Sequence, residues 1–123
     1  MKISLIAEDA LRVDPSDTPL TVETPDQNTQ YSPFHMLASA LATCIYSLLG
    51  AWAENAKLDS SDLAIEVEWT FAEEPHRVAT LGVELDWPSL PDARKDAAER
   101  AARLCTVHAT LTHPPEISVN LAR

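Results

Sequence analysis

Two cysteines, Cys44 and Cys105, are the side chains with the most obvious capacity for chemistry. A thiolate can reduce a peroxide by attacking its O–O bond. A free thiol has a pKa of about 8.5, so it needs a nearby cation or a helix N-terminus to ionise at neutral pH. Cys44 lies well inside a predicted helix, beyond the first turn where that helix's own dipole acts. We therefore expect a cation from elsewhere in the chain to activate it, and Arg12 and His108 are the candidates.

Other roles for these residues stay open. Free cysteine often simply fills space in a core, so both thiols could be packing residues. Cys105, His108 and His113 could bind zinc, although no fourth ligand lies nearby in the sequence. A Cys-His nucleophile for acyl transfer lacks an oxyanion motif, because the only glycines are Gly50 and Gly82.

The segment that carries Cys44 is unusually apolar, since residues 36–53 contain no charged side chain. It is just long enough for a membrane span, but about half of it is Ala, Ser, Thr and Gly, which favours a helix buried by protein on all sides. Ser32 followed by Pro33 is a helix-start signal, so we expect a helix from Pro33 to about Ala56. A helix this long in so short a chain suggests that a second subunit covers part of it.

The rest of the chain predicts one α+β domain spanning residues 1–123. Alternating apolar residues indicate antiparallel strands, two of them forming a hairpin. The expected strands are 2–8, 11–13, 20–23, 63–71, 78–87 and 116–121. A second helix is expected over residues 88–108, and its alanines 93, 97 and 101 form a narrow stripe leading to Cys105. This stripe would let the two helices pack closely.

Charge narrows the choice of partners and compartment. The chain has 123 residues, with 19 acidic against 9 basic side chains and a net charge of −10. This charge disfavours nucleic acid and anionic membrane surfaces as partners. The first residues do not match a secretory signal, so we expect a cytoplasmic protein whose thiols are kept reduced. We expect neither a cofactor nor a metal.

Two motifs resemble the OsmC/Ohr family. "SPFHMLASALATC", residues 32–44, is similar to the family's helix signature, in which Ser-Pro is followed by a Leu- and Ala-rich run and a cysteine. "ARLCTVHATL", residues 102–111, resembles the second cysteine motif. The predicted order of elements agrees over nearly the whole chain.

The resemblance implies an intertwined homodimer with the long helices at its centre and the cysteines at the subunit interface. It also implies a thiol peroxidase that acts on organic hydroperoxides. Cys44 would be the peroxidatic cysteine and Cys105 the resolving one, the two condensing to a disulfide. A dithiol reductant, lipoyl-linked in characterised relatives, would restore both thiols.

The sequence also departs from the family. Phe34 occupies the position of a glutamate that holds the catalytic arginine in the peroxidases, and the arginine-bearing N-terminal motif is missing. The chain therefore resembles a divergent branch, in which His108 is a possible substitute cation.

The apolar helix also supplies the candidate substrate-binding residues, Phe34, Leu37, Leu48 and Trp52. Trp52, like Trp69 and Trp87, is equally compatible with a plain core position. The alternative function is a noncatalytic dimer that binds a small hydrophobic molecule in a cavity at the interface.

Overall fold

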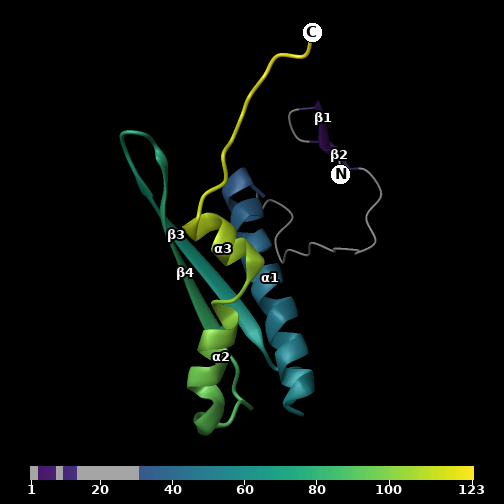
Figure 1. Ribbon diagram of the computed structural model, residues 1–123, viewed down its shortest axis with the longest axis vertical. Coiled ribbons are helices and arrows are strands. Elements are labelled where there is room, and N and C mark those ends of the chain that lie inside the picture. Colours follow the sequence, from purple (N-terminus) through teal and green to yellow (C-terminus); the bar gives the residue numbers. More distant parts are fainter. Residues whose placement is uncertain (1–2, 8–9, 14–30) are drawn as a thin grey trace. The chain divides into compact units, whose positions relative to one another are not determined.

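The computed structural model describes residues 3–7, 10–13 and 31–123, which belong to two compact units (Figure 1). The first unit, Met1–Gln30, contains strands β1 (Ile3–Ala7) and β2 (Ala10–Val13), which pair antiparallel. They confirm the strands expected at 2–8 and 11–13. The strand expected at 20–23 lies outside the described residues.

The second unit, Tyr31–Arg123, is built around helix α1 (Pro33–Asn55). The backbone N–H of His35 donates to Ser32 Oγ at 3.3 Å, and the Ser32 N–H donates to His35 Nδ1 at 3.2 Å. Ser32 and His35 therefore form a capping box in which histidine takes the place usually held by Glu or Gln. The helix start predicted from Ser32 and Pro33 is confirmed.

In the part of the chain that the structure describes, the buried residues of α1 lie on one side of the helix. Its buried residues lie three or four positions apart, as a helix packed on one face requires. They are Ala38, Leu41, Ile45, Leu49 and Ala53. Elsewhere on the helix, Met36 is 40% exposed and Tyr46 is 45% exposed. Among the described residues, packing partners cover one face of the helix, so burial on all sides with the help of a second subunit stays a prediction.

A β-hairpin follows α1, formed by β3 (Ala64–Ala72) and β4 (Arg77–Asp86). Its register pairs Val67 with Val83 and Trp69 with Leu81, so apolar side chains share the face toward α1. A bulge after Thr70 pairs Phe71 with Val78 instead of Ala79. The hairpin predicted from the alternating pattern is confirmed, and the bulge shifts the pattern by one residue at its outer end.

The expected second helix over 88–108 is divided into shorter elements. The structure has a 3₁₀ turn η1 (Asp92–Arg94), helix α2 (Lys95–Ala102) and helix α3 (Thr106–Thr112). The chain leaves the helical conformation at Cys105, whose φ of −60° and ψ of 134° are extended. The prediction of one continuous helix is wrong because α2 ends at Ala102 and Cys105 caps a separate helix.

The buried alanines of α2 also differ from the expected stripe. Ala98 and Ala102 are buried with Cys105, whereas Ala93 is exposed. The spacing of four was right, but the buried stripe lies one residue later in the sequence. This register places Ala98 and Ala102 in one core with Leu49 and Ala53 of α1.

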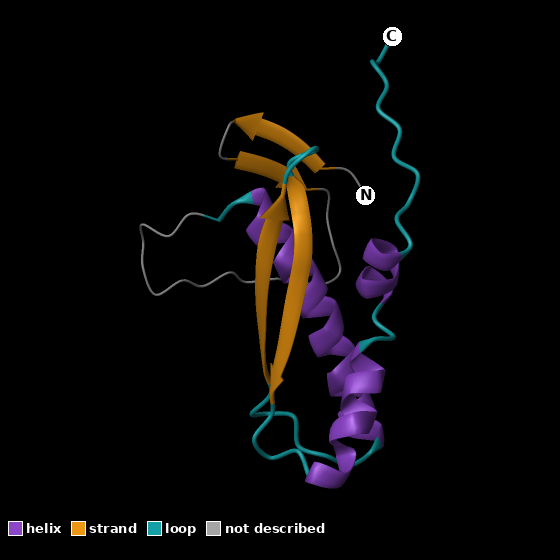
Figure 2. Cartoon of the chain, turned by 90° about the vertical axis from the view of Figure 1, so that its left-hand side faces the viewer, coloured by secondary structure: helices purple, strands orange, loops and turns teal. Residues whose placement is uncertain are grey.

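The last predicted strand, 116–121, is absent from this described part of the chain. Ile117, Val119 and Leu121 are 81%, 92% and 82% exposed. An extended segment needs a neighbouring strand for its backbone hydrogen bonds, and residues 31–123 place none beside it. The segment runs away from α3 in the two side views (Figures 1 and 2).

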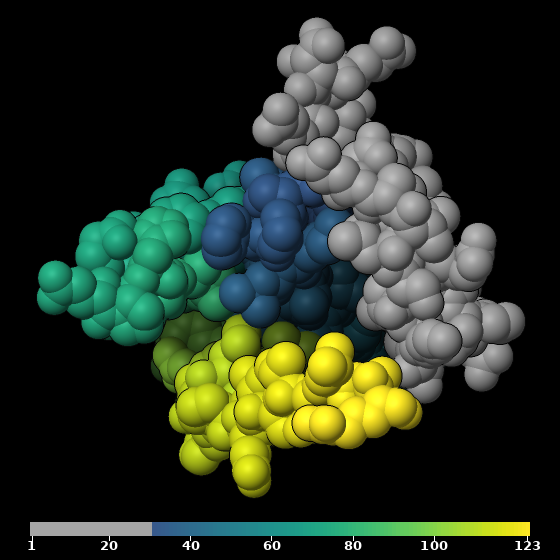
Figure 3. All heavy atoms as spheres, turned by 90° about the horizontal axis from the view of Figure 1, so that it is seen from above, coloured from purple at the N-terminus to yellow at the C-terminus, as the bar shows by residue number. Residues whose placement is uncertain are grey.

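Within the second unit, α1 packs against the hairpin and also contacts α2 and α3. Viewed from above, the first turns of α1 lie between the hairpin and the C-terminal part of the chain (Figure 3). At the other end of the unit, Trp87 Nε1 donates to the Asp59 carbonyl at 2.9 Å, which fixes this core residue to the loop after α1. The α+β prediction is confirmed, and the folded unit brings α1 against the turn that contains Cys105.

Candidate redox site

The two cysteines meet where α1 faces the junction between α2 and α3. Cys105 is 1% exposed and belongs to the core cluster, and the half-buried Cys44 packs against that cluster. Both are free thiols. Residues far apart in the sequence are thus brought together as the two cysteine motifs implied.

Cys105 occupies the N-cap position of α3. Its Sγ accepts a hydrogen bond from the backbone N–H of His108 at 3.4 Å. An N-cap side chain satisfies one of the N–H groups that lack a partner in the first helical turn. The first turn of α3, with Thr106 and Val107, lies next to Cys44.

This arrangement lowers the pKa of the Cys44 thiol. The neighbouring Cys105 thiol is the largest cause, followed by the backbone N–H of Val107, while partial burial acts in the opposite direction and the N–H of Thr106 lowers the pKa further. Hydrogen bonds to a thiolate stabilise the charged form. Within the described residues, the activating groups are therefore a thiol and two backbone amides, where the sequence had suggested a side-chain cation.

The pKa of Cys105 moves the other way. Burial raises the pKa of its thiol, and the adjacent Cys44 raises it further, against smaller lowering effects from the N–H groups of His108 and Val107. Cys44 therefore ionises before Cys105. This order is the one that a nucleophilic Cys44 and a resolving Cys105 require.

The two candidate cations lie in different places. Arg12 is on β2 in the first unit, and its side chain lies outside the described residues. His108 is half-buried in the first turn of α3. Its backbone N–H binds Cys105, while its imidazole lines an adjacent groove.

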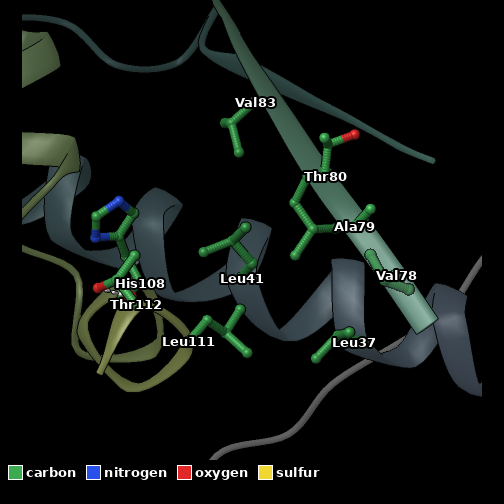
Figure 4. Close-up of a pocket in the computed structure, with 10 residues that line it drawn as sticks. Leu37, Leu41, Val78, Ala79, Thr80, Val83, His108, Leu111 and Thr112 are labelled. Atoms are coloured by element: carbon green, nitrogen blue, oxygen red, sulfur yellow. Dashed lines mark hydrogen bonds between the residues drawn. The ribbon is translucent and has the colours of Figure 1, made fainter. Parts of the chain in front are cut away.

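That groove lies between β4 and α3 and has a volume of about 340 Å³. His108, Leu111 and Thr112 face β4 across it, with Leu41 of α1 between them (Figure 4). Leu37 of α1 lines its other end. A smaller groove of about 220 Å³ shares Leu81, Val83 and His108 and extends toward Glu99 and Arg103. Neither groove is lined by Cys44 itself.

The four candidate substrate-binding residues are spread along α1. Leu37 lines the larger groove, whereas Leu48 and Trp52 pack against the core. Trp52 lies edge-to-face with Trp87 at a centroid distance of 6.0 Å. Phe34 lies edge-to-face with Phe71 at 5.0 Å, near the outer end of the hairpin. The structure thus brings only Leu37 of this set into the groove beside His108.

Sequence reasoning missed two features of the site. The first is the helix break at Cys105, and the second is the contribution of the Thr106 and Val107 amides. The spacing of Cys105 and His108 was a usable signal, because an N-cap side chain bonds the backbone three residues later. Within residues 31–123, no group of three or more His, Cys, Asp or Glu side chains is arranged to hold a metal ion.

Comparison with known proteins establishes the family. The model of the OsmC-like protein family matches residues 25–120, so the chain belongs to the OsmC-like family. A crystal structure of a proposed osmotic stress induced and detoxification response protein from Psychrobacter arcticus 273-4 has a TM-score of 0.62 and 25% sequence identity. The match covers 68% of this chain and 62% of that one, so the similarity spans less than two thirds of the neighbour. A comparison with curated proteins found no match.

Membership in the OsmC-like family also helps to decide whether α1 is a core helix or a membrane span. By length and composition alone the helix could cross a membrane, but core helices of soluble proteins pass the same test. OsmC-like proteins are generally soluble, so we interpret α1 as a core helix.

Proposed function

We propose that this protein is a thiol-dependent peroxidase that reduces organic hydroperoxides, with Cys44 as the peroxidatic and Cys105 as the resolving cysteine. The observation that carries the proposal is the pairing of two free thiols, the half-buried Cys44 and the buried Cys105, in one core cluster. Such a pairing places one thiol to attack a hydroperoxide and the other to attack the resulting sulfenic acid.

The chemistry balances with a dithiol as reductant. The Cys44 thiolate attacks the terminal oxygen of the hydroperoxide, an S–O bond forms, the O–O bond breaks, and the alkoxide takes a proton to leave as an alcohol. The Cys105 thiolate then attacks the Cys44 sulfenic acid, forming the disulfide and releasing hydroxide, which is protonated to water. A dithiol, lipoyl-linked by analogy with the family, reduces the disulfide and is itself oxidised to a disulfide.

The larger groove supports an organic substrate. Leu37, Leu41, Val78 and Leu111 give it an apolar lining beside the turn that activates Cys44. Burial of an alkyl or aryl group there would favour a hydrophobic hydroperoxide over hydrogen peroxide. Such chemistry fits a cytoplasmic protein whose thiols are kept reduced between turnovers.

A homodimer is part of the proposal. Cys44 is only half-buried, and the exposed Met36 and Tyr46 leave one face of α1 without a partner among residues 31–123. The exposed, alternating residues of 116–121 are likewise suited to pairing with another chain. A second copy covering α1 would shield Cys44 from bulk water.

Turnover measurements test the proposed function. The purified protein should consume cumene hydroperoxide with dihydrolipoamide as the reductant, and faster than it consumes hydrogen peroxide. Cys44→Ser should abolish turnover, whereas Leu104→Ala, at a residue that is 78% exposed, should leave it unchanged. Equal turnover by the wild type and Cys44→Ser would refute the proposal.

The groove also favours the second candidate, a noncatalytic dimer that binds a small hydrophobic molecule. The observation that favours this second function is that neither groove is lined by Cys44, so ligand binding need not involve the thiol. Binding of an apolar fluorescent probe, unchanged in Cys44→Ser, together with absent turnover, is the result that would favour this function.

A further inference from the structure

We propose that formation of the Cys44–Cys105 disulfide releases the cap of α3 and so loosens one wall of the larger groove. This inference rests on the proposed peroxidase function, because that function supplies the disulfide. The oxidation state of one sulfur then controls the shape of the groove. The dithiol form holds the wall in place, and the disulfide form loosens it.

The sulfur that caps α3 is the same atom that forms the disulfide. In the reduced chain, Cys105 Sγ accepts the backbone N–H of His108 at 3.4 Å. Cys44 of α1 packs against the core cluster that contains Cys105. A disulfide restricts the dihedral angles of both of its side chains. After oxidation the position of the Cys105 sulfur is therefore set by its bond to Cys44 and no longer by the N–H of His108.

Helix α3 depends strongly on this cap. It has seven residues, and a helix this short is marginal without support from its surroundings. Its β-branched residues, which lower helix propensity, make up more than half of it. They are Thr106, Val107, Thr110 and Thr112. In the part of the chain that the structure describes, no residue of α3 is fully buried, so packing compensates little for the loss of a cap.

The same helix supplies one wall of the larger groove. His108, Leu111 and Thr112 face β4 across it (Figure 4). His108 is also the residue whose N–H the cap binds. Loss of the cap therefore acts directly on the first residue of the wall, and Leu111 and Thr112 follow in the next turn of α3.

This coupling suits a turnover cycle. One hydroperoxide takes two electrons and two protons from the two thiols, the O–O bond breaks, and one alcohol and one water are released as the S–S bond forms. The alcohol keeps the alkyl or aryl group of the substrate, so loosening the wall favours its departure from the groove. Reduction of the disulfide by a dithiol restores the Cys105 thiol, the cap and the groove.

Hydrogen exchange of the α3 amides tests the inference. The dithiol form is compared with protein oxidised by one equivalent of diamide, whose N=N bond takes up the same two electrons and two protons, so no hydroperoxide is needed. A loss of about two mass units confirms the disulfide. We expect the amides of residues 108–112 to exchange about tenfold faster in the disulfide form, the scale of losing an N-cap. The amides of Val67 and Val83 in the hairpin should be unchanged.

Three variants separate the cap from the oxidant. Cys44→Ser cannot form the intramolecular disulfide, so diamide should leave its α3 amides unchanged. Cys105→Ser keeps a preferred N-cap residue, so its α3 amides should exchange slowly with or without diamide. Cys105→Ala has no cap, so its α3 amides should exchange without any oxidant about as fast as those of the oxidised wild type.

Unchanged exchange of α3 in protein that has lost two mass units would overturn the inference and leave the peroxidase function standing. Faster exchange throughout residues 31–123 would also overturn it, because the disulfide would then destabilise the whole folded unit. Loosening of α3 by diamide, in protein that cumene hydroperoxide does not oxidise, would instead refute the peroxidase function and support the redox-sensitive cap.

Discussion

The backbone N–H of His108 donates to Cys105 Sγ at 3.4 Å, which makes a cysteine the cap of α3. The contact joins the two halves of the candidate site. Cys105 is buried there, and the Thr106 and Val107 amides of the same turn lower the pKa of Cys44. A cysteine near the end of a continuous helix, as the sequence suggested, would not have presented those amides.

The two thiols should titrate separately. Because the pKa of Cys44 is lowered and that of Cys105 is raised, iodoacetamide should alkylate Cys44 first as pH increases, with an apparent pKa below that of an ordinary thiol. Peptide mapping of partly alkylated protein at a series of pH values measures both. Cys105→Ala should move the Cys44 profile to higher pH, since it removes the largest stabilising neighbour. Preferential alkylation of Cys105 at low pH would contradict the order of ionisation.

The packing of α2 on α1 gives a prediction about stability. Ala98 is 1% exposed, so Ala98→Leu should overpack the core and lower the free energy of unfolding by about 1 to 3 kcal/mol. Ala93→Leu, at an exposed position on η1, is the matched control and should change stability by less than about 0.5 kcal/mol. Urea denaturation of both variants measures the difference. A larger loss of stability for Ala93→Leu than for Ala98→Leu would instead support the stripe of alanines 93, 97 and 101 that was expected from the sequence.

The groove should govern selectivity between peroxides. Leu111 lines it and is 38% exposed, so Leu111→Trp can be accommodated while filling part of the space. We expect the rate with cumene hydroperoxide to fall by roughly tenfold, the scale of losing an apolar contact, with little change for hydrogen peroxide. Leu104→Trp, at a position that does not line the groove, serves as the control. Equal losses with both peroxides would mean that the groove does not bind the organic group.

The uncovered face of α1 should be the subunit interface. Tyr46 is 45% exposed within the uncharged stretch 36–53 of α1, and Tyr46→Glu would place a charge in the interface. Sedimentation equilibrium should show a dimer for the wild type and dissociation toward monomer for Tyr46→Glu. Ala93→Glu is the control for added charge. A wild-type monomer at micromolar concentration would exclude this interface.

Much of the fold could be predicted from local patterns. Ser32 and Pro33 marked the start of α1, and the alternation in residues 63–71 and 78–87 marked the hairpin, because both signals depend on neighbouring residues. The break before α3 could not be predicted in this way. The run of Ala and Arg before Cys105 favours a continuous helix, but α2 ends at Ala102 and the buried Cys105 caps the next helix.

The site was predictable in part. Cys44 and Cys105 were identified from their motifs. The groups that lower the pKa of Cys44 were sought among the side chains of Arg12 and His108, because the sequence does not show which backbone amides will lie near a thiol. Segment 116–121 shows a second limit of prediction from local sequence. Its alternation is that of a strand, yet a strand exists only where a neighbour accepts its hydrogen bonds.

The central claim is that Cys44 is oxidised by an organic hydroperoxide and captured by Cys105, and intact-protein mass tests it most directly. Brief exposure of the reduced protein to one equivalent of cumene hydroperoxide should remove about two mass units within seconds, as a disulfide requires. Cys44→Ser should be unchanged and Cys105→Ser should instead gain about sixteen units as a sulfenic acid. An unchanged wild-type mass after many minutes would contradict the account and favour the binding function.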